Sequence, residues 1–135
     1  MINLHHVKPG DTVITNYAGV EREGKVLEVL HEDKKILVHT SDDGNDLWYD
    51  QDNVYPIHLT EKELLRLQFH VDETQSGNGK GTLYIRGPFS VRWYGEGHDP
   101  RLTLHYRDET RVLRESITLN ELQNHYHQMT NYSLE

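Results

Sequence analysis

The sequence predicts an α+β protein: a small β-barrel formed by residues 1–57, followed by a small antiparallel sheet flanked by two helices in residues 58–135. Short β-rich runs separated by turn residues fill the first part, which is typical of a barrel. In the second part, two helix-capping patterns enclose three runs of alternating apolar and polar residues. A meander with helices on its apolar side is an α+β arrangement.

Size and composition limit the classes of protein to which the chain can belong. Its 135 residues suffice for one domain of ordinary size or two very small ones that share a core. The absence of cysteine excludes disulfides and thiolate metal sites, which fits a reducing compartment. No apolar run approaches the roughly 20 residues needed to cross a bilayer. The start "MINLHHVKPGDTV" lacks the pattern of a signal peptide, so we expect a cytoplasmic protein without a membrane partner.

The net charge of −8 is spread unevenly along the chain. Residues 1–57 hold five Lys/Arg against eleven Asp/Glu, and residues 58–135 hold nine against eleven. Because nonspecific affinity for nucleic acid comes mainly from cationic contacts, the acidic first part disfavours such a partner. The second part, rich in arginine, is the better candidate for nucleic-acid contact.

The sequence of the first part predicts five strands, with a turn between each strand and the next. They are expected over residues 12–17, 24–31, 35–40, 47–49 and 54–57. The cluster "SDDGND" should turn the chain, with Gly44 at a positive φ. The predicted interior consists of Val13, Val26, Val29, Ile36, Val38, Leu47 and Val54.

The order of these parts resembles the SH3-like barrels of the Tudor and KOW type. The features that match are "KPGDTV", the glycine-led "GKVLEVL", and the single turn "DQDN" before "VYPI", within residues 5–57. The resemblance implies a fold and says little about function, because such barrels serve many unrelated tasks.

Aromatic residues of the barrel allow two interpretations. In a Tudor-type reader, aromatic rings at the rim form a cage for a methylated cation, with a carboxylate such as Asp50 or Asp52 as charge partner. The candidate rings are Tyr17, Trp48, Tyr49 and Tyr55. Alternatively, Trp48 and Tyr49 point to opposite faces of one strand. One ring then fills the barrel, and the other covers the join to the second part.

The second part begins and ends with a helix. Thr60 with Glu63, and Thr118 with Glu121, form two capping boxes. In the second helix Leu119, Leu122, Tyr126 and Met129 should face the sheet. The glycine-rich "DETQSGNGKG" lacks the order of a phosphate-binding loop and is expected to be a plain loop.

Three strands are expected between the helices, in "TLYIRG", "FSVRWYG" and "RLTLHYR", with "ETRVLRESITL" as an edge strand. Alternation assigns one face to Leu83, Ile85, Val91, Trp93, Leu102, Leu104 and Tyr106. The other face receives Tyr84, Arg86, Arg92, Tyr94, Thr103, His105 and Arg107. Arginine interleaved with tyrosine can stack bases and pair with phosphates. The same face can instead contact a protein, or simply form the wet side of an antiparallel sheet.

Signals for catalysis, metals and cofactors are weak. His125 and His127 lie two residues apart on a helix and so point to different sides, unlike a metal-binding i, i+4 pair. The chain has no G-x-S-x-G, no cysteine nucleophile and no H-E-x-x-H. We therefore expect no enzyme, and assign no catalytic, cofactor-binding or metal-binding residue.

Two stretches, "YPIHLTEKELLRLQF" and "ITLNELQNHYHQMTNYSLE", resemble a family of small uncharacterised proteins of gut bacteria, their phages and prophages. The matching positions at the junction are Pro56, Ile57, Leu59, Thr60, Glu61 and Leu64. Those in the final helix are Leu119, Glu121, Leu122, Gln123, Asn124, Tyr126 and Thr130. The chain departs from the pattern in "LQF", where "GF" is usual, and in "TN", where the helix normally stops at "TG"; Asn131 can replace that glycine at a left-handed cap. The resemblance implies a phage or mobile-element role and no established activity.

The sequence as a whole indicates a non-enzymatic interaction module whose partner is another protein. A nucleic-acid-binding accessory protein that uses the Arg/Tyr face of the sheet is the alternative. The candidate binding surface comprises Tyr17, Trp48, Tyr49, Tyr55, Tyr84, Arg86, Arg92, Tyr94, His105 and Arg107. The oligomeric state is left open, because an exposed barrel edge can pair with a second copy.

Overall fold

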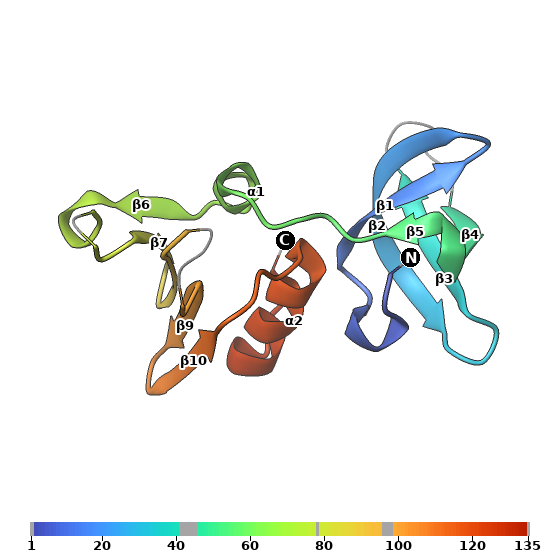
Figure 1. Cartoon of the computed structure of the whole chain (residues 1–135). Helices are drawn as coiled ribbons and strands as arrows, with labels where there is room; N and C mark the ends of the chain where they lie inside the picture. Colours follow the sequence, from blue (N-terminus) through green and yellow to red (C-terminus); the bar gives the residue numbers. More distant parts are fainter. Residues whose placement is uncertain (1, 41–45, 78, 96–98, 135) are drawn as a thin grey trace. The chain divides into compact units, whose positions relative to one another are not determined.

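The computed structural model describes residues 2–40, 46–77, 79–95 and 99–134, and it confirms the α+β class (Figure 1). The chain forms two compact units. We call Met1–His58 with Thr118–Glu135 the barrel unit, and Leu59–Ile117 the sheet unit. The predicted turn at Gly44 lies outside the described residues.

The barrel unit contains a five-stranded antiparallel sheet that curls on itself (Figure 1). Its strands are β1 (Thr12–Tyr17), β2 (Val20–Leu30), β3 (Lys35–Thr40), β4 (Asp46–Asp50) and β5 (Val54–Tyr55), in the order β4-β3-β2-β1-β5. Short 3₁₀ helices η1 (Leu4–His6) and η2 (Gln51–Asn53) precede β1 and β5. A closing strand that follows one helical turn and pairs with the first strand is the SH3-like order expected from the sequence.

Strand β2 is longer than the sequence predicted. Ala18 and Gly19 have φ values of 53° and 80° and form a two-residue turn, so Tyr17 pairs directly with Val20. The register shifts between Val26 and Glu28, which is a β-bulge. Because of this extra residue, Val26 and Val29 both face inward although they are three residues apart.

The core of the barrel unit largely follows the predicted alternation. Val13, Val26, Ile36, Val38 and Val54 are fully buried, and the partly buried Val29 packs against them. The prediction for Leu47 is wrong, because this residue lies near the start of an edge strand and stays 37% exposed. The core also contains Ile2, Leu4 and Val7, which the alternation did not identify, and Tyr49, the one of the two neighbouring rings that fills the barrel.

The sheet unit contains a second antiparallel sheet and one short helix. The helix is α1 (Glu61–Arg66), and the strands are β6 (His70–Asp72), β7 (Thr82–Arg86), β8 (Phe89–Trp93), β9 (Leu102–Tyr106) and β10 (Glu109–Leu113), in the order β10-β9-β8-β7-β6. A 3₁₀ helix, η3 (Glu73–Gln75), follows β6. The predicted edge strand is confirmed as β10. Strand β6 was not predicted, because three residues are too few to show alternation.

The register of β7 corrects the predicted faces of this sheet. Tyr84 pairs with Val91, which pairs with Leu104, so these three side chains share one face. Leu83 pairs with Arg92 and therefore lies on the opposite face, and Ile85 lies there too. The cause is the two-residue turn between Arg86 and Phe89, which shifts β7 by one residue relative to the expected alignment and exchanges its two faces.

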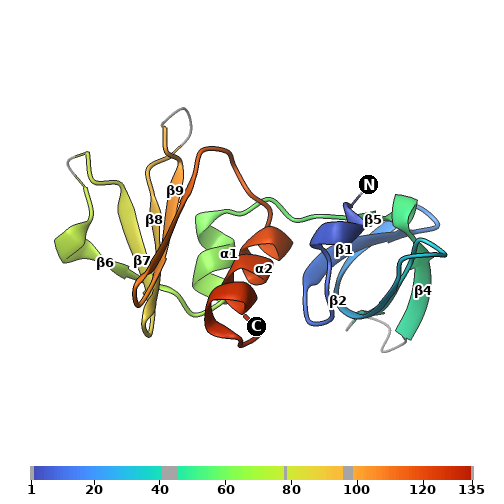
Figure 2. The same ribbon diagram turned by 90° about the horizontal axis from the view of Figure 1, so that it is seen from below.

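The core of the sheet unit lies on the face that carries Tyr84. Phe89, Val91 and Leu104 are fully buried there. Phe69, which follows α1, meets the ring of Phe89 edge-on with 6.1 Å between the ring centroids. Helix α1 lies on one side of the strands (Figure 2). It begins where predicted, because the Thr60 hydroxyl accepts a hydrogen bond from the Glu63 amide at 3.4 Å.

Helix α2 (Leu119–Thr130) has both ends that the sequence predicted. Thr118 and Glu121 form a complete capping box, and Asn131 ends the helix in the left-handed conformation, with φ of 65°. The helix belongs to the barrel unit, whereas the sequence suggested grouping it with the second sheet. Its buried amides reach the barrel backbone: Asn120 Nδ2 donates to the His6 carbonyl at 2.9 Å.

The two segments that join the units run beside each other. The Leu119 amide donates to the Ile57 carbonyl at 2.7 Å, and His58 forms an antiparallel bridge with Thr118. One residue further on, the Leu59 amide donates to the Ile117 carbonyl at 3.3 Å. The sheet unit is therefore an insertion between β5 and α2 whose two ends are adjacent. Neither of the two α-helices in the described ranges is long and apolar enough to cross a membrane.

Candidate functional site

The sheet unit has an open pocket with a volume of about 500 Å³. It is lined by the start of α1, the start of β7 and the end of β8. We call it the aromatic pocket; its lining residues are Leu59, Thr60, Glu61, Gly81, Thr82, Tyr84, Trp93, Tyr94 and Gly95. Among them are Tyr84 and Tyr94, two members of the predicted binding surface.

The strand register explains why these residues meet. Thr82 is paired with Trp93, so Thr82, Tyr84 and Trp93 project from the same face of the sheet. Thr60 caps α1, so Glu61 is the first residue of that helix and lies beside this face. The start of α1 and the two strands of the β7–β8 hairpin thereby contribute to one concavity.

Two of the residues that line the pocket are glycines, which place no side chain in it. Gly81 has a φ of 70°, and a Cβ atom built on it would lie 2.4 Å from the Trp93 carbonyl oxygen. No side chain fits at this position without displacing backbone, so the close approach of residue 81 to β8 requires glycine. Gly95, with a φ of 100°, borders the pocket at the end of β8.

The electrostatics of the pocket depend on one carboxylate. Tyr84 is buried, and desolvation raises the pKa of its hydroxyl; the charge of Glu61 and a hydrogen bond to it raise this pKa further. Glu61 itself is exposed. Of the described residues that line the pocket, Glu61 alone carries a formal charge at neutral pH. The pocket is therefore an aromatic hollow with one negative edge.

The barrel aromatics do not form a comparable cluster in the described residues. Tyr49 is buried in the barrel core, whereas Tyr17, Trp48 and Tyr55 are exposed and lie on β1, β4 and β5. No ring contact joins these three side chains within the described part of the chain. Tyr49 pairs with Ile36 inside and Trp48 with Leu37 outside, which confirms that the two neighbours point to opposite faces. That Trp48 covers the join between the units stays a prediction.

The prediction of a single Arg/Tyr sheet face is wrong. Tyr84 and Arg86 lie on the face opposite Arg92 and His105, because of the β7 register. His105 Nδ1 forms a hydrogen bond with the Thr110 hydroxyl at 2.9 Å. Tyr94 and Arg107 follow β8 and β9 rather than lying within them. The Arg107 guanidinium stacks over the neighbouring Tyr106 ring, 5.1 Å from its centroid.

Arg92 fixes the segment that follows β6. Its Nη1 atom donates to the carbonyl of Gln75 at 2.8 Å and to that of Lys80 at 2.7 Å. A guanidinium held by two backbone carbonyls has a structural task, since charge-assisted hydrogen bonds are among the stronger ones in proteins. A phosphate would have to compete with these bonds.

The Arg92→Gln variant is expected to loosen this segment without unfolding the sheet. Loss of the two charged hydrogen bonds should speed amide exchange at Gly77 and Lys80 by about tenfold. Hydrogen exchange followed by NMR measures this change. Arg114→Gln is the control, because Arg114 pairs with Asp99 at the surface. Unchanged exchange at both amides would contradict the role of Arg92.

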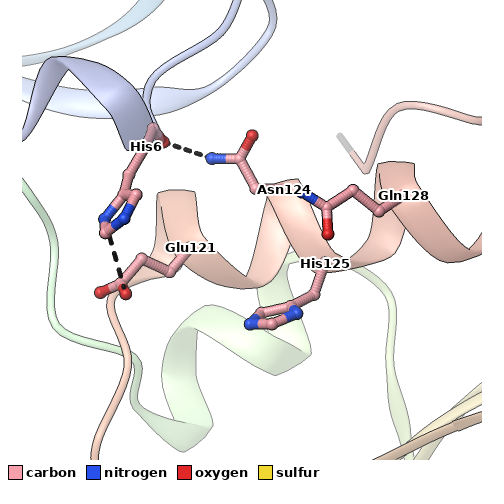
Figure 3. Close-up of a pocket in the computed structure, with 5 residues that line it drawn as sticks. All are labelled: His6, Glu121, Asn124, His125 and Gln128. Carbon is pink, nitrogen blue, oxygen red and sulfur yellow. Dashed lines mark hydrogen bonds and ion pairs between the residues drawn. The ribbon is translucent and has the colours of Figure 1, made fainter. Parts of the chain in front are cut away.

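A smaller cavity of about 170 Å³ lies in the barrel unit beside α2 (Figure 3). His6, Glu121, Asn124, His125 and Gln128 line it. His6 Nδ1 lies 3.8 Å from Glu121 Oε2, and Asn124 Nδ2 donates to the His6 carbonyl (Figure 3). Within the described residues, no three His, Asp or Glu side chains are grouped closely enough to hold a metal ion.

Asp11, near this cavity, is a buried carboxylate that sequence reasoning missed. Its side chain accepts from the Lys8 amide at 3.0 Å and from Asn124 Nδ2 at 3.4 Å, and it pairs with Lys8 Nζ. Burial raises the pKa of Asp11 above its ordinary value of 3.8, and the contacts with Lys8 oppose this effect. The signal in the sequence was the turn "KPGD", which places Lys8 and Asp11 at its two ends.

The raised pKa of Asp11 predicts a pH dependence of stability. Well below pH 3.8 Asp11 is protonated in both the folded and the unfolded state, so it adds no pH dependence there. As the pH rises from 3.8 through the higher folded pKa, the unfolded state ionises first, and the wild type loses stability. The Asp11→Asn variant lacks this loss. The free energy of unfolding of the variant minus that of the wild type should therefore increase as the pH rises across this window. Urea denaturation of both proteins between about pH 3 and 6 measures this difference. A difference that stays constant or falls as the pH rises would contradict the prediction.

Sequence reasoning missed three residues of the aromatic pocket that matter most. Trp93 was assigned to the apolar face as plain core, and Glu61 and Gly81 were not considered as site residues. The available signal was glycine beside a strand end, in "GKGTLY" and "RWYG", which indicates close backbone approach.

Comparisons with known proteins assign no family to this geometry. No protein-family model matches the chain, and no curated protein or solved structure is significantly similar to it.

Proposed function

We propose that this chain is a non-enzymatic interaction module of a phage or another mobile element, and that it binds another protein through the aromatic pocket. The observation that carries the proposal is the lining of the pocket: Tyr84, Trp93 and Tyr94 around a volume of about 500 Å³. The resemblance of the junction and the final helix to phage and prophage proteins supports the mobile-element part.

The composition of the pocket supports binding rather than catalysis. Its described lining residues include no histidine, serine, cysteine or lysine, and its one carboxylate, Glu61, is exposed. Tryptophan and tyrosine are the side chains that most often dominate the affinity of a protein interface. An open hollow between such rings can receive one protruding side chain of a partner.

Two observations weaken the nucleic-acid alternative. Residues 59–117 hold nine Lys/Arg and nine Asp/Glu, so the sheet unit offers no excess of positive charge. Arg92, which the alternative assigned to phosphate, already donates to two backbone carbonyls.

A capture experiment tests the proposal. The tagged full chain is incubated with lysate of a bacterial host, with and without nuclease, beside the variants Trp93→Ala, Tyr94→Ala and Trp48→Ala. We expect a partner that survives nuclease and is retained by Trp48→Ala, but lost with both pocket variants. Circular dichroism checks that each variant is folded. Loss of every partner after nuclease would contradict the proposal, as would capture that neither pocket variant reduces.

A further inference from the structure

We propose that the aromatic pocket receives the side chain of a lysine on the partner protein. This inference rests on the proposed function and names the chemistry that the pocket recognises: an ammonium group on an aliphatic stem.

The lining of the pocket is complementary to such a group. Trp93, Tyr94 and Tyr84 line it, and the faces of aromatic rings attract cations. Glu61 adds a full negative charge at one edge. No Lys or Arg is found among the described lining residues. The methylene stem of a lysine can pack on Leu59 and the rings while its head stays near water.

Hydrogen bonding at Glu61 favours lysine over arginine. Glu61 acts on the Tyr84 hydroxyl, because its charge and hydrogen bonding help to raise the pKa of that hydroxyl. Arginine gains most from a carboxylate when both oxygens accept in parallel, and Tyr84 already engages this one. A lysine ammonium is a compact point charge and needs no such fork.

The distribution of charge over the chain supports a basic partner. The sheet unit is neutral, so the whole net charge of −8 falls on the barrel unit, which holds five Lys/Arg and thirteen Asp/Glu. A strongly acidic protein attracts basic surfaces over a distance of about 10 Å at ordinary salt. This attraction acts at the barrel unit; within the sheet unit, Glu61 supplies the negative charge among the described lining residues of the pocket.

Tryptophan fluorescence gives a direct test, because the chain has two tryptophans and only Trp93 lies in the pocket. The full chain with Trp48→Phe is titrated with a short alanine peptide that has blocked ends and a central lysine. The same peptide with norleucine in place of lysine is the neutral match. We expect the lysine peptide to bind about fivefold more tightly or better, which is the range of a cation–π contact aided by a carboxylate.

The variant Glu61→Gln tests the charge. It should weaken the lysine peptide about fivefold and leave the norleucine peptide unchanged. Glu115→Gln is the matched control, since Glu115 is exposed in the same unit and does not line the pocket. It should change neither affinity.

The outcomes separate this inference from the proposed function. Equal binding of the two peptides, or no effect of Glu61→Gln, would overturn the lysine assignment even if Trp93→Ala still abolishes capture of a partner. Preference for the lysine peptide without any captured protein would overturn the proposed function and this assignment to a partner protein, and would leave only a pocket for ammonium groups.

Discussion

Replacing Gln123 by leucine is expected to lower the free energy of unfolding of the barrel unit by about 3 kcal/mol, because two buried backbone groups lose their partners. The Gln123 side chain is fully buried on α2. Its Oε1 accepts from the Thr12 amide at 2.9 Å, and its Nε2 donates to the Leu134 carbonyl at 2.9 Å. One side chain thus provides hydrogen-bond partners for a backbone amide at the start of β1 and for a backbone carbonyl after α2. Leucine fills similar space but satisfies neither group.

Urea denaturation measures this loss if the signal comes from the barrel unit alone. Trp93→Phe leaves Trp48 as the single tryptophan, and Trp48 lies on β4. Gln128→Leu is the control, because Gln128 is an exposed residue of the same type on the same helix. It should change stability by less than about 0.5 kcal/mol. A loss below about 1 kcal/mol for Gln123→Leu would show that the two backbone groups find other partners.

The Phe89→Ala variant should destabilise the sheet unit by about 3–5 kcal/mol, the usual cost of removing a buried phenylalanine ring. Phe89 is fully buried at the start of β8, and its ring packs edge-on against Phe69. Its strand neighbours include Tyr106, opposite it on β9. Truncation to alanine leaves a cavity among these rings, and the surrounding strands can close it only in part.

Here the signal comes from Trp93, with Trp48→Phe removing the other tryptophan. Val112→Ala on β10 is the control, since Val112 is 54% exposed and should cost less than about 1 kcal/mol. If Phe89→Ala cost no more than Val112→Ala, Phe89 could not be the centre of this core.

The sequence predicted the parts of the fold that depend on neighbouring residues. The helix starts at Thr60 and Thr118 and the left-handed end at Asn131 follow from local capping chemistry, and the structure has all three. The inward Ile36 and Val38 of β3 follow from alternation, because one face of that strand is buried. These features need no knowledge of distant contacts.

The errors had two causes. The length of the turn at Gly87 and Pro88 set the register of β7 and exchanged the faces of Leu83 and Tyr84, so this error came from a turn whose length was not recognised. Gln123 and Thr12 are separated by 111 residues, so the unit to which α2 belongs could not be inferred from its amphipathic pattern. The aromatic pocket likewise joins Glu61 and Trp93, which only the folded sheet brings together.

The adjacent ends of the inserted sheet unit have a consequence for folding during translation. Residues 59–117 are continuous, so this segment can fold as soon as it leaves the ribosome. The barrel cannot complete its contacts until residues 118–134 have been made, because Gln123 and Asn120 close bonds to segments synthesised long before. The sheet unit, which begins later in the sequence, can thus be finished first, while the Thr12 amide and the His6 carbonyl still lack their partners on α2.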